Sequence, residues 1–141
     1  MPATLTEHVP ARIGSTVDDV RRAFAEAAVI EKVHFCAAAE PALPARLRAF
    51  DRPLVVVAGM ETHVCVLQTA LALQDQGFAV HLCVDACGAR HPLDAAIARE
   101  RAAARGIVAV TSDMVAFEWL RRADHPARRT VIEAVKAKGA V

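Results

Sequence analysis

The chain has 141 residues, a size that fits one domain with a hydrophobic core of its own. Apolar residues make up 55% of it and charged residues 23%, which excludes a disordered chain and is ordinary for a globular surface. The formal net charge is +1, with basic and acidic residues interleaved, so we expect neither a nucleic-acid partner nor binding to an anionic membrane.

The sequence also limits the compartment and the inorganic chemistry. No apolar run approaches the length needed to cross a bilayer, and residues 1–12 (MPATLTEHVPAR) lack the profile of a signal peptide. We therefore expect a cytoplasmic protein without a membrane partner. In that reducing compartment the cysteines should be free thiols: Cys36, Cys65, Cys83 and Cys87. No CxxC or HExxH motif occurs, so we expect no metal site.

Four elements are expected in the first third of the chain, alternating between strand and helix. They are Thr4–His8, Thr16–Ala27, Val29–Lys32 and Glu40–Phe50. The first helix places Val17, Val20 and Phe24 on one face, and Ser15 or Thr16 is its expected N-cap. Two prolines make the second helix the poorer of the two.

The clearest strand is Pro53–Gly59 (PLVVVAG), which is apolar on both faces, as a central parallel strand covered by helices must be. The next helix, His63–Gln76, is apolar nearly all round, which predicts burial, and Gly77 is placed to end it. The remaining elements again alternate: Ala79–Asp85, Pro92–Arg105, Gly106–Thr111, Ser112–Arg122 (N-cap Ser112 or Asp113) and Pro126–Lys138. This alternation predicts an α/β domain with a mostly parallel sheet, and no repeat or long linker divides residues 1–141.

The strongest chemical signal lies in residues 55–71 (VVVAGMETHVCVLQTAL). A strand ends at Gly59, and Cys65 falls in the first turn of the helix that follows. Free N–H groups at a helix N-terminus stabilise a thiolate, and they also stabilise an oxyanion formed by its attack. Ligands of open α/β sheets bind at the carboxyl ends of the strands. Cys65 is therefore a candidate nucleophile; the alternative is a packed core cysteine, as expected for Cys83.

Residues 59–90 (GMETHVCVLQTALALQDQGFAVHLCVDACGAR) resemble the nucleophile segment of the isochorismatase-like cysteine hydrolases, a superfamily that includes nicotinamidases and N-carbamoylsarcosine amidases. The glycine, Cys-Val and Asp-Ala positions of that segment match Gly59, Cys65-Val66 and Asp85-Ala86. Residues 29–35 (VIEKVHF) resemble the lysine motif, with the lysine at Lys32. TEHVP and TSDMVAFEWLRRADHP are further matches, and together they look most similar to the isochorismatase-domain-containing hydrolases of poorly defined substrate.

The resemblance implies a three-layer α/β/α fold with a Rossmann-like sheet, and hydrolysis of an amide-type C–N or related bond in a small molecule without a cofactor. It implies that Cys65 forms a covalent intermediate and that Lys32 keeps its thiolate ionised. Taken alone, Lys32 would be read as a surface lysine. A cis peptide at Met60–Glu61 would aim backbone amides, including that of Cys65, at the oxyanion. Relatives generally assemble, so we expect a homo-oligomer.

Three residues are expected to line the substrate pocket: His8, Phe35 and Glu61. His8 lies in the TEHVP match, and the alternative for it is an ordinary surface histidine. Glu61 lies in the turn before the nucleophile helix, where an acidic group meets the helix dipole favourably. The alternative for Glu61 is therefore a capping acid with no role toward substrate.

In the superfamily, the catalytic aspartate ends a first strand that has no counterpart here. No aspartate ends a buried strand ahead of the lysine motif; the candidates are Asp18, Asp19, Asp51, Asp75, Asp94, Asp113 and Asp124. We expect the first strand and helix of the fold to be missing, which leaves two strand edges unpaired. The chain would then be a piece of a normal enzyme, a variant whose sheet closes differently, or a non-catalytic member.

Two functions of different classes therefore compete. One is a cysteine hydrolase; the other is a catalytically inactive binding or oligomerisation module that keeps the fold. A nucleotide-binding Rossmann domain is disfavoured because no GxGxxG motif follows any strand.

Overall fold

A computed structural model describes residues 1–138 and shows five strands whose pairings are all parallel. The strands form two hydrogen-bonded groups. One group joins β1 (Thr4–His8) to β2 (Ala28–Lys32), and the other has the order β3 (Leu54–Met60), β4 (Ala79–Gly88), β5 (Val108–Val110). Parallel pairing is as predicted. However, no ladder joins the two groups within the described residues, so β1 and β3 each pair on one edge only.

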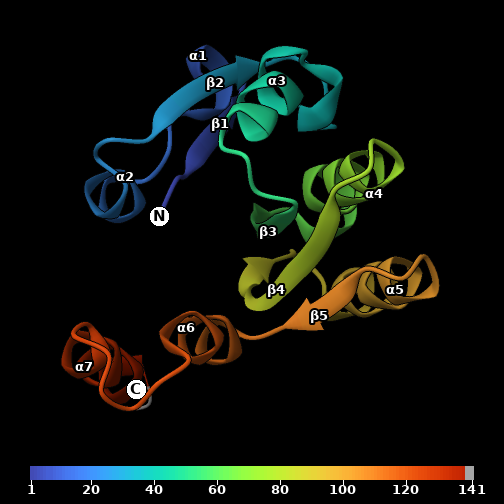
Figure 1. Ribbon diagram of the computed structural model, residues 1–141. Coiled ribbons are helices and arrows are strands. Elements are labelled where there is room, and N and C mark those ends of the chain that lie inside the picture. The colour runs from blue at the N-terminus through green and yellow to red at the C-terminus, as the bar shows by residue number, and fades with distance from the viewer. Residues whose placement is uncertain (139–141) are drawn as a thin grey trace.

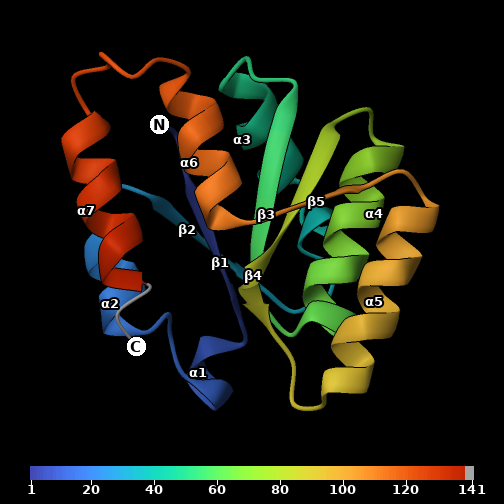
Figure 2. The same ribbon diagram turned by 90° about the horizontal axis from the view of Figure 1, so that it is seen from below.

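Helices cover both faces of the strands, which confirms the predicted three layers (Figure 1). On one side lie α3 (Ala42–Ala49), α4 (Leu67–Asp75) and α5 (Pro92–Ala104). On the other lie α2 (Asp18–Ala23) near β1 and β2, and α6 (Ser112–Leu120) with α7 (Arg128–Lys138) at the end of the molecule beyond β5 (Figure 1), while Figure 2 views the same helices from below. Two short elements complete the fold, the single turn α1 (Pro10–Ile13) and the 3-10 turn Ala37–Ala39.

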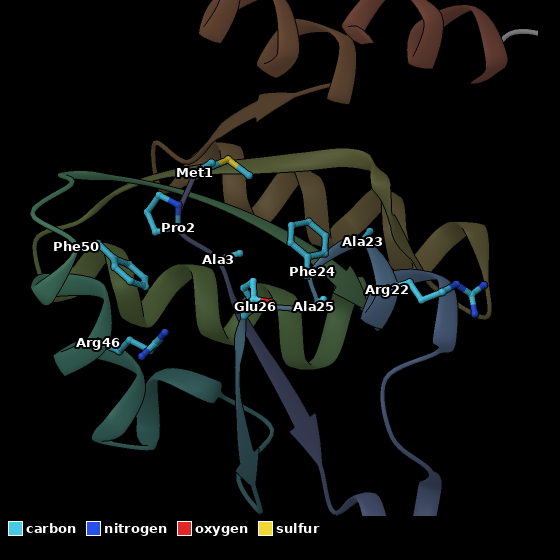
Figure 3. A pocket seen from close by; sticks show the side chains of 11 residues that line it. Met1, Pro2, Ala3, Arg22, Ala23, Phe24, Ala25, Glu26, Arg46 and Phe50 are labelled. Carbon is cyan, nitrogen blue, oxygen red and sulfur yellow. The ribbon is translucent and has the colours of Figure 1, made fainter. Parts of the chain in front are cut away.

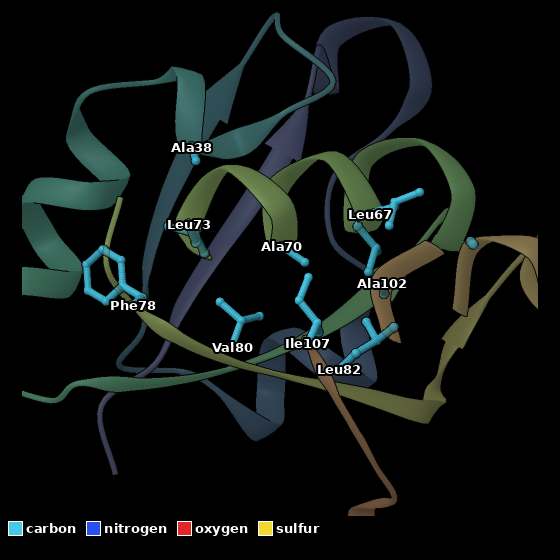
Figure 4. Close-up of a cluster of buried hydrophobic side chains, with 11 residues drawn as sticks. Ala38, Leu67, Ala70, Leu73, Phe78, Val80, Leu82, Ala102 and Ile107 are labelled. Atoms are coloured by element: carbon cyan, nitrogen blue, oxygen red, sulfur yellow. The ribbon is translucent and has the colours of Figure 1, made fainter. Parts of the chain in front are cut away.

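The main hydrophobic core lies between α4, β4 and α5 (Figure 4). Ala70 and Leu73 of α4 point at Val80 and Leu82 of β4, and all four are buried. The apolar character of residues 63–76 thus predicted burial correctly. Ile107 enters the same cluster just before β5. This packing fixes the end of β3 and the start of α4, where the site is built.

Strand β3 is less buried than its sequence predicts. Its end residues Leu54 and Met60 are 38% and 70% exposed, and none of its residues is fully buried. Val55 and Val57 still pack against the main core. The prediction of a covered central strand is therefore wrong for residues 1–138, because β3 has a partner strand on one edge only.

The first predicted helix is shorter than expected, and its N-cap was misassigned. Val17 precedes α2 without any side-chain cap, and the backbone N–H of Thr16 instead donates to Glu7 Oε1 at 2.8 Å. The apolar face formed by Val17, Val20 and Phe24 is exposed. A one-and-a-half-turn helix with no buried residue gains little from amphipathicity, which explains why the pattern overestimated it.

Other helices end at a glycine or begin at a hydroxyl-bearing cap residue. Gly77 and Gly106, at φ 91° and 81°, follow α4 and α5 as predicted. The N-cap of α6 is Thr111, whose hydroxyl accepts from Met114 N at 3.3 Å, so the predicted Ser112 or Asp113 is wrong. Ser112 is unavailable because its hydroxyl and N–H both bind Asp85.

None of the helices within residues 1–138 combines the length and the apolar character needed to cross a membrane. The predicted single domain spans residues 1–141, of which 139–141 lie outside the described residues.

Candidate functional site

Cys65 lies in a wide turn between β3 and α4. The peptide bond Met60–Glu61 is cis, as the resemblance implied, and residues Thr62–Val66 form one π-helical turn. The Glu61 carbonyl accepts from the N–H of both Val64 and Val66, at 3.1 and 3.2 Å. The predicted helix at His63 thus begins as a π turn, a rare form often found at functional sites. The side chain of Cys65 is half-buried there.

Lys32, the last residue of β2, reaches across to this turn. Its Nζ lies 3.7 Å from Cys65 Sγ and donates to the carbonyls of His34 and Phe35 at 2.9 and 3.0 Å. Lys32 is only 5% exposed, so the reading as a surface lysine is wrong. The contact joins β2 to the β3–α4 connection across 33 residues of sequence.

The ammonium of Lys32 is buried without a carboxylate counterion. Among residues 1–138, no Asp or Glu oxygen forms an ion pair with it. Two carbonyls satisfy part of its hydrogen-bonding capacity, and the sulfur of Cys65 is its third partner. A buried cation is stabilised when a neighbouring group carries negative charge, and a thiolate at this position would do so.

Glu61 is held by an arginine that the sequence analysis did not single out. Arg90, after β4, places Nε 2.7 Å from Glu61 Oε1 and Nη2 3.3 Å from Oε2. The Glu61 side chain makes no hydrogen bond to the turn that follows it, which excludes a hydrogen-bonding cap, while a favourable interaction with the helix dipole stays a prediction. The hydroxyl of Thr62 donates to Gly88 O at 2.9 Å. Arg90 is the last residue of the segment 59–90 that resembles the hydrolase family. That position is the only sequence signal that could have singled it out.

His8 and Phe35, both predicted at the pocket, lie together. Their rings are 4.9 Å apart and inclined by 35°. His8 also lies opposite Lys32 in the β1–β2 register. The Nδ1 atom of His8 is buried and has no hydrogen-bond partner in the described part of the chain, and Phe35 is 53% exposed. The structure therefore gathers His8, Lys32 and Phe35 at one end of β1 and β2.

Cys65 lines neither of the two best-defined cavities among the described residues. The larger, of about 410 Å³, lies between the N-terminus, the end of α2 and α3 (Figure 3). Phe24, Arg46 and Phe50 line it, and no residue of the turn that holds Cys65 does. The smaller, of about 250 Å³, includes Lys32 and Glu40 in its wall.

The other thiols differ from Cys65 in their surroundings. All four cysteines are free. Burial raises the pKa of Cys83 to about 11, and its hydrogen bond to the Asp85 carboxylate adds to the effect. Burial also raises the pKa of Cys87. Cys83 is therefore a core residue, as predicted. Within residues 1–138, no three His, Cys, Asp or Glu side chains are grouped to hold a metal ion.

Comparison with curated proteins places the chain among named relatives. It is 35% identical over 137 residues to Isochorismatase domain-containing protein 1 of Danio rerio, covering 96% of this chain and 48% of that protein. It is 34% identical over 139 residues to Isochorismatase domain-containing protein 2 of Bos taurus, covering 96% and 65%. The chain thus spans about half to two thirds of the length of these relatives.

Solved structures show the same fold. The MAR1 ribonuclease of Caenorhabditis elegans matches with a TM-score of 0.86 and 28% identity, covering 94% of this chain and 68% of that one. A hypothetical protein from Trypanosoma cruzi matches with 0.84 and 30%, covering 96% and 70%.

The sequence profile of the isochorismatase domain matches residues 2–114, a span that includes both Lys32 and Cys65. The chain therefore belongs to the isochorismatase domain family.

Proposed function

We propose that this chain is a cysteine hydrolase that cleaves an amide-type C–N or related bond of a small molecule, with Cys65 as nucleophile. The observation that carries the proposal is the 3.7 Å contact between Lys32 Nζ and Cys65 Sγ. A buried ammonium beside a sulfur favours the thiolate over the thiol, and the thiolate is the nucleophilic form.

The proposed reaction has two covalent steps. The thiolate sulfur adds to the carbonyl carbon, and the C–N bond breaks as the nitrogen takes a proton from a solvent water molecule and leaves as the amine, which forms a thioester on Cys65. The oxygen of a second water molecule then displaces the sulfur, and the proton that this step releases neutralises the hydroxide left by the first, so the acid is released and the thiolate returns. Lys32 Nζ, held by the carbonyls of His34 and Phe35, stabilises the sulfur whenever it carries negative charge.

The oxyanion of each step needs donors near the nucleophile. We assign this role to backbone amides of the turn that includes Met60, Glu61 and Cys65. We assign the walls of the substrate pocket to His8, Phe35 and Glu61. The His8–Phe35 pair offers a flat apolar face with an unpartnered ring nitrogen, a combination suited to a small polar molecule.

A second candidate, the inactive binding or oligomerisation module, is favoured by one specific observation. Hydrolysis needs a group that protonates the leaving nitrogen and deprotonates water. No carboxylate within residues 1–138 forms an ion pair with Lys32. In this module the Lys32–Cys65 pair would be retained without turnover.

We also propose a cytoplasmic location and a homo-oligomer. The free cysteines support the first, since thiols persist in a reducing compartment. Exposed Met114, Phe117 and Trp119 on α6 support the second, because apolar side chains gathered on one helix are typical of subunit contacts. The ribonuclease name belongs to the Caenorhabditis elegans neighbour; with a net charge of +1, we do not propose RNA as a substrate here.

The test measures ammonia release from a panel of small aliphatic and aromatic amides, together with intact mass spectrometry of the protein. We expect Cys65→Ser to lower turnover by about a thousandfold or more, and wild type to show an acyl adduct on Cys65. Cys36→Ser is the matched control, with another half-buried free thiol changed in the same way.

Ammonia release that survives in Cys65→Ser would contradict the hydrolase proposal. No release from any amide, with Cys65 alkylated as slowly as Cys36, would support the inactive module instead.

A further inference from the structure

The turn that carries Cys65, called the nucleophile turn below, includes Met60, Glu61 and Thr62. Each of these three residues contacts the end of β4 or the segment just after it. Met60 lies opposite Gly88 in the strand register, and a Cβ on Gly88 would come within 3.2 Å of the Met60 side chain. The hydroxyl of Thr62 donates to Gly88 O at 2.9 Å, and Thr62 is only 2% exposed. Between these two contacts stands Glu61, whose side chain extends to Arg90.

Glu61 is fixed at both ends. Its carbonyl accepts from two N–H groups of the π turn that holds Cys65, and its carboxylate receives two hydrogen bonds from the Arg90 guanidinium. The two-point geometry matters because a guanidinium fork orients a carboxylate as well as neutralising it. Glu61 therefore links the Arg90 side chain to the turn that carries Cys65.

We propose that Arg90 is a positioning residue for Cys65, and this rests on the proposed role of Cys65 as a nucleophile. Arg90 does two things through Glu61. It holds the residue whose carbonyl anchors the π turn, and it neutralises the carboxylate that directly precedes this turn. An unpaired carboxylate there would oppose the thiolate, because a neighbouring like charge disfavours the ionised form.

Removal of Arg90 should affect the reactivity of Cys65 more than the folding stability of the protein. An exposed ion pair contributes little to folding, and the Arg90 side chain is 73% exposed. The Glu61 side chain, in contrast, is 24% exposed, so its charge is felt more strongly by neighbouring groups. Loss of Arg90 should therefore change the chemistry of Cys65 while leaving the melting temperature nearly unchanged.

Arg105 provides a matched control. It forms an ion pair of the same length with Asp75, 2.7 Å, between the end of α5 and the end of α4. Both partners of that pair are more than half exposed, and neither belongs to the nucleophile turn. Arg105→Ala removes the same kind of side chain and the same net charge as Arg90→Ala.

The experiment measures alkylation of Cys65 at neutral pH by neutral iodoacetamide and by anionic iodoacetate, with peptide mass spectrometry. We expect Arg90→Ala to slow iodoacetamide by about fivefold, the size of effect that one unpaired neighbouring charge produces. Iodoacetate should slow further, because the freed Glu61 carboxylate repels it. Arg90→Lys should recover part of the rate, and Arg105→Ala should leave both rates unchanged.

The double variant Glu61→Gln with Arg90→Ala tests the coupling. We expect its alkylation rates to lie within about twofold of Glu61→Gln alone, since no carboxylate is left to neutralise. Equal slowing by Arg90→Ala with and without Glu61 would overturn the proposal, and so would an unchanged rate in Arg90→Ala. If wild-type Cys65 reacts no faster than Cys36, the proposed function itself fails, and the role of Arg90 fails with it.

Discussion

Two regions of this protein meet at the Lys32–Cys65 contact, and they are packed very differently. The region of α4, β4 and α5 supplies most of the main core, with Leu73 and Leu82 almost fully buried. The region of β1, β2 and α2 has one buried residue, and that residue is Lys32. Cys65 thus lies on the densely packed region, while Lys32 comes from a strand pair with little core of its own.

This difference in packing indicates which substitutions would disturb the Lys32–Cys65 contact. The 3.7 Å contact spans two groups of strands that no ladder joins within the described residues. Its geometry therefore depends on side-chain packing at the join rather than on strand pairing. Reactivity of Cys65 should respond to changes on either side, whereas folding stability should respond mainly to changes on the dense side.

Leu73→Ala should have the largest effect on stability. Leu73 is 1% exposed at the centre of the core, so truncation removes buried contacts and leaves a cavity. We expect the free energy of unfolding to fall by about 2–5 kcal/mol, measured by urea titration. A loss below about 1 kcal/mol would show that the two regions do not differ as described.

Lys32→Met tests the other side of the contact. Methionine keeps an unbranched side chain, one atom shorter, and removes its charge, so a Cys65 thiolate loses its neighbouring cation. We expect alkylation of Cys65 by iodoacetamide at neutral pH to slow by about tenfold. Lys136→Met, on the exposed surface of α7, is the control. Equal rates in both variants would mean that Lys32 does not act on the sulfur.

Asp85→Asn tests how α7 is attached. Lys138 of α7 and Ser112 of α6 bind the Asp85 carboxylate and hold its pKa well below the ordinary value. A lowered pKa contributes stability above the unfolded value of about 4, and this is lost as the pH falls further. We expect a loss of about 1 kcal/mol at pH 7, shrinking in acid.

Chemical unfolding from pH 7 down to pH 3 measures this, with Asp18→Asn, an exposed aspartate at the start of α2, as control. A difference between wild type and Asp85→Asn that stays constant across that range would contradict the assigned role of the carboxylate.

Phe24→Ala should have the smallest effect. Phe24 lies at the end of α2 beside the larger cavity and is 37% exposed, so its truncation returns little apolar area to water. We expect a stability change below about 1 kcal/mol, in the same urea titration as Leu73→Ala. A loss equal to that of Leu73→Ala would mean that the β1–β2 region has a core not evident from burial.

Much of this protein was determined by local sequence. The strand Thr4–His8 was predicted with its observed bounds, and Gly77 and Gly106 marked the ends of two helices. The family resemblance around Lys32 and Cys65 directed attention to both residues and implied the cis bond between Met60 and Glu61, which is present. Such features depend on backbone preferences and on short-range patterns, which a sequence records directly.

Side-chain burial, long-range ion pairs and the pairing of strand edges were decided by the tertiary structure alone. The resemblance alone pointed from Lys32 to Cys65; composition and periodicity near Lys32 predict an exposed lysine, and only the fold shows that it is buried against a sulfur 33 residues away. The partner of Glu61 is Arg90, 29 residues further along the chain, and no local capping rule predicts that pair. The division of the strands and the exposure of β3 also depend on which edges find partners. These are long-range contacts, and packing selects them after the local elements have formed.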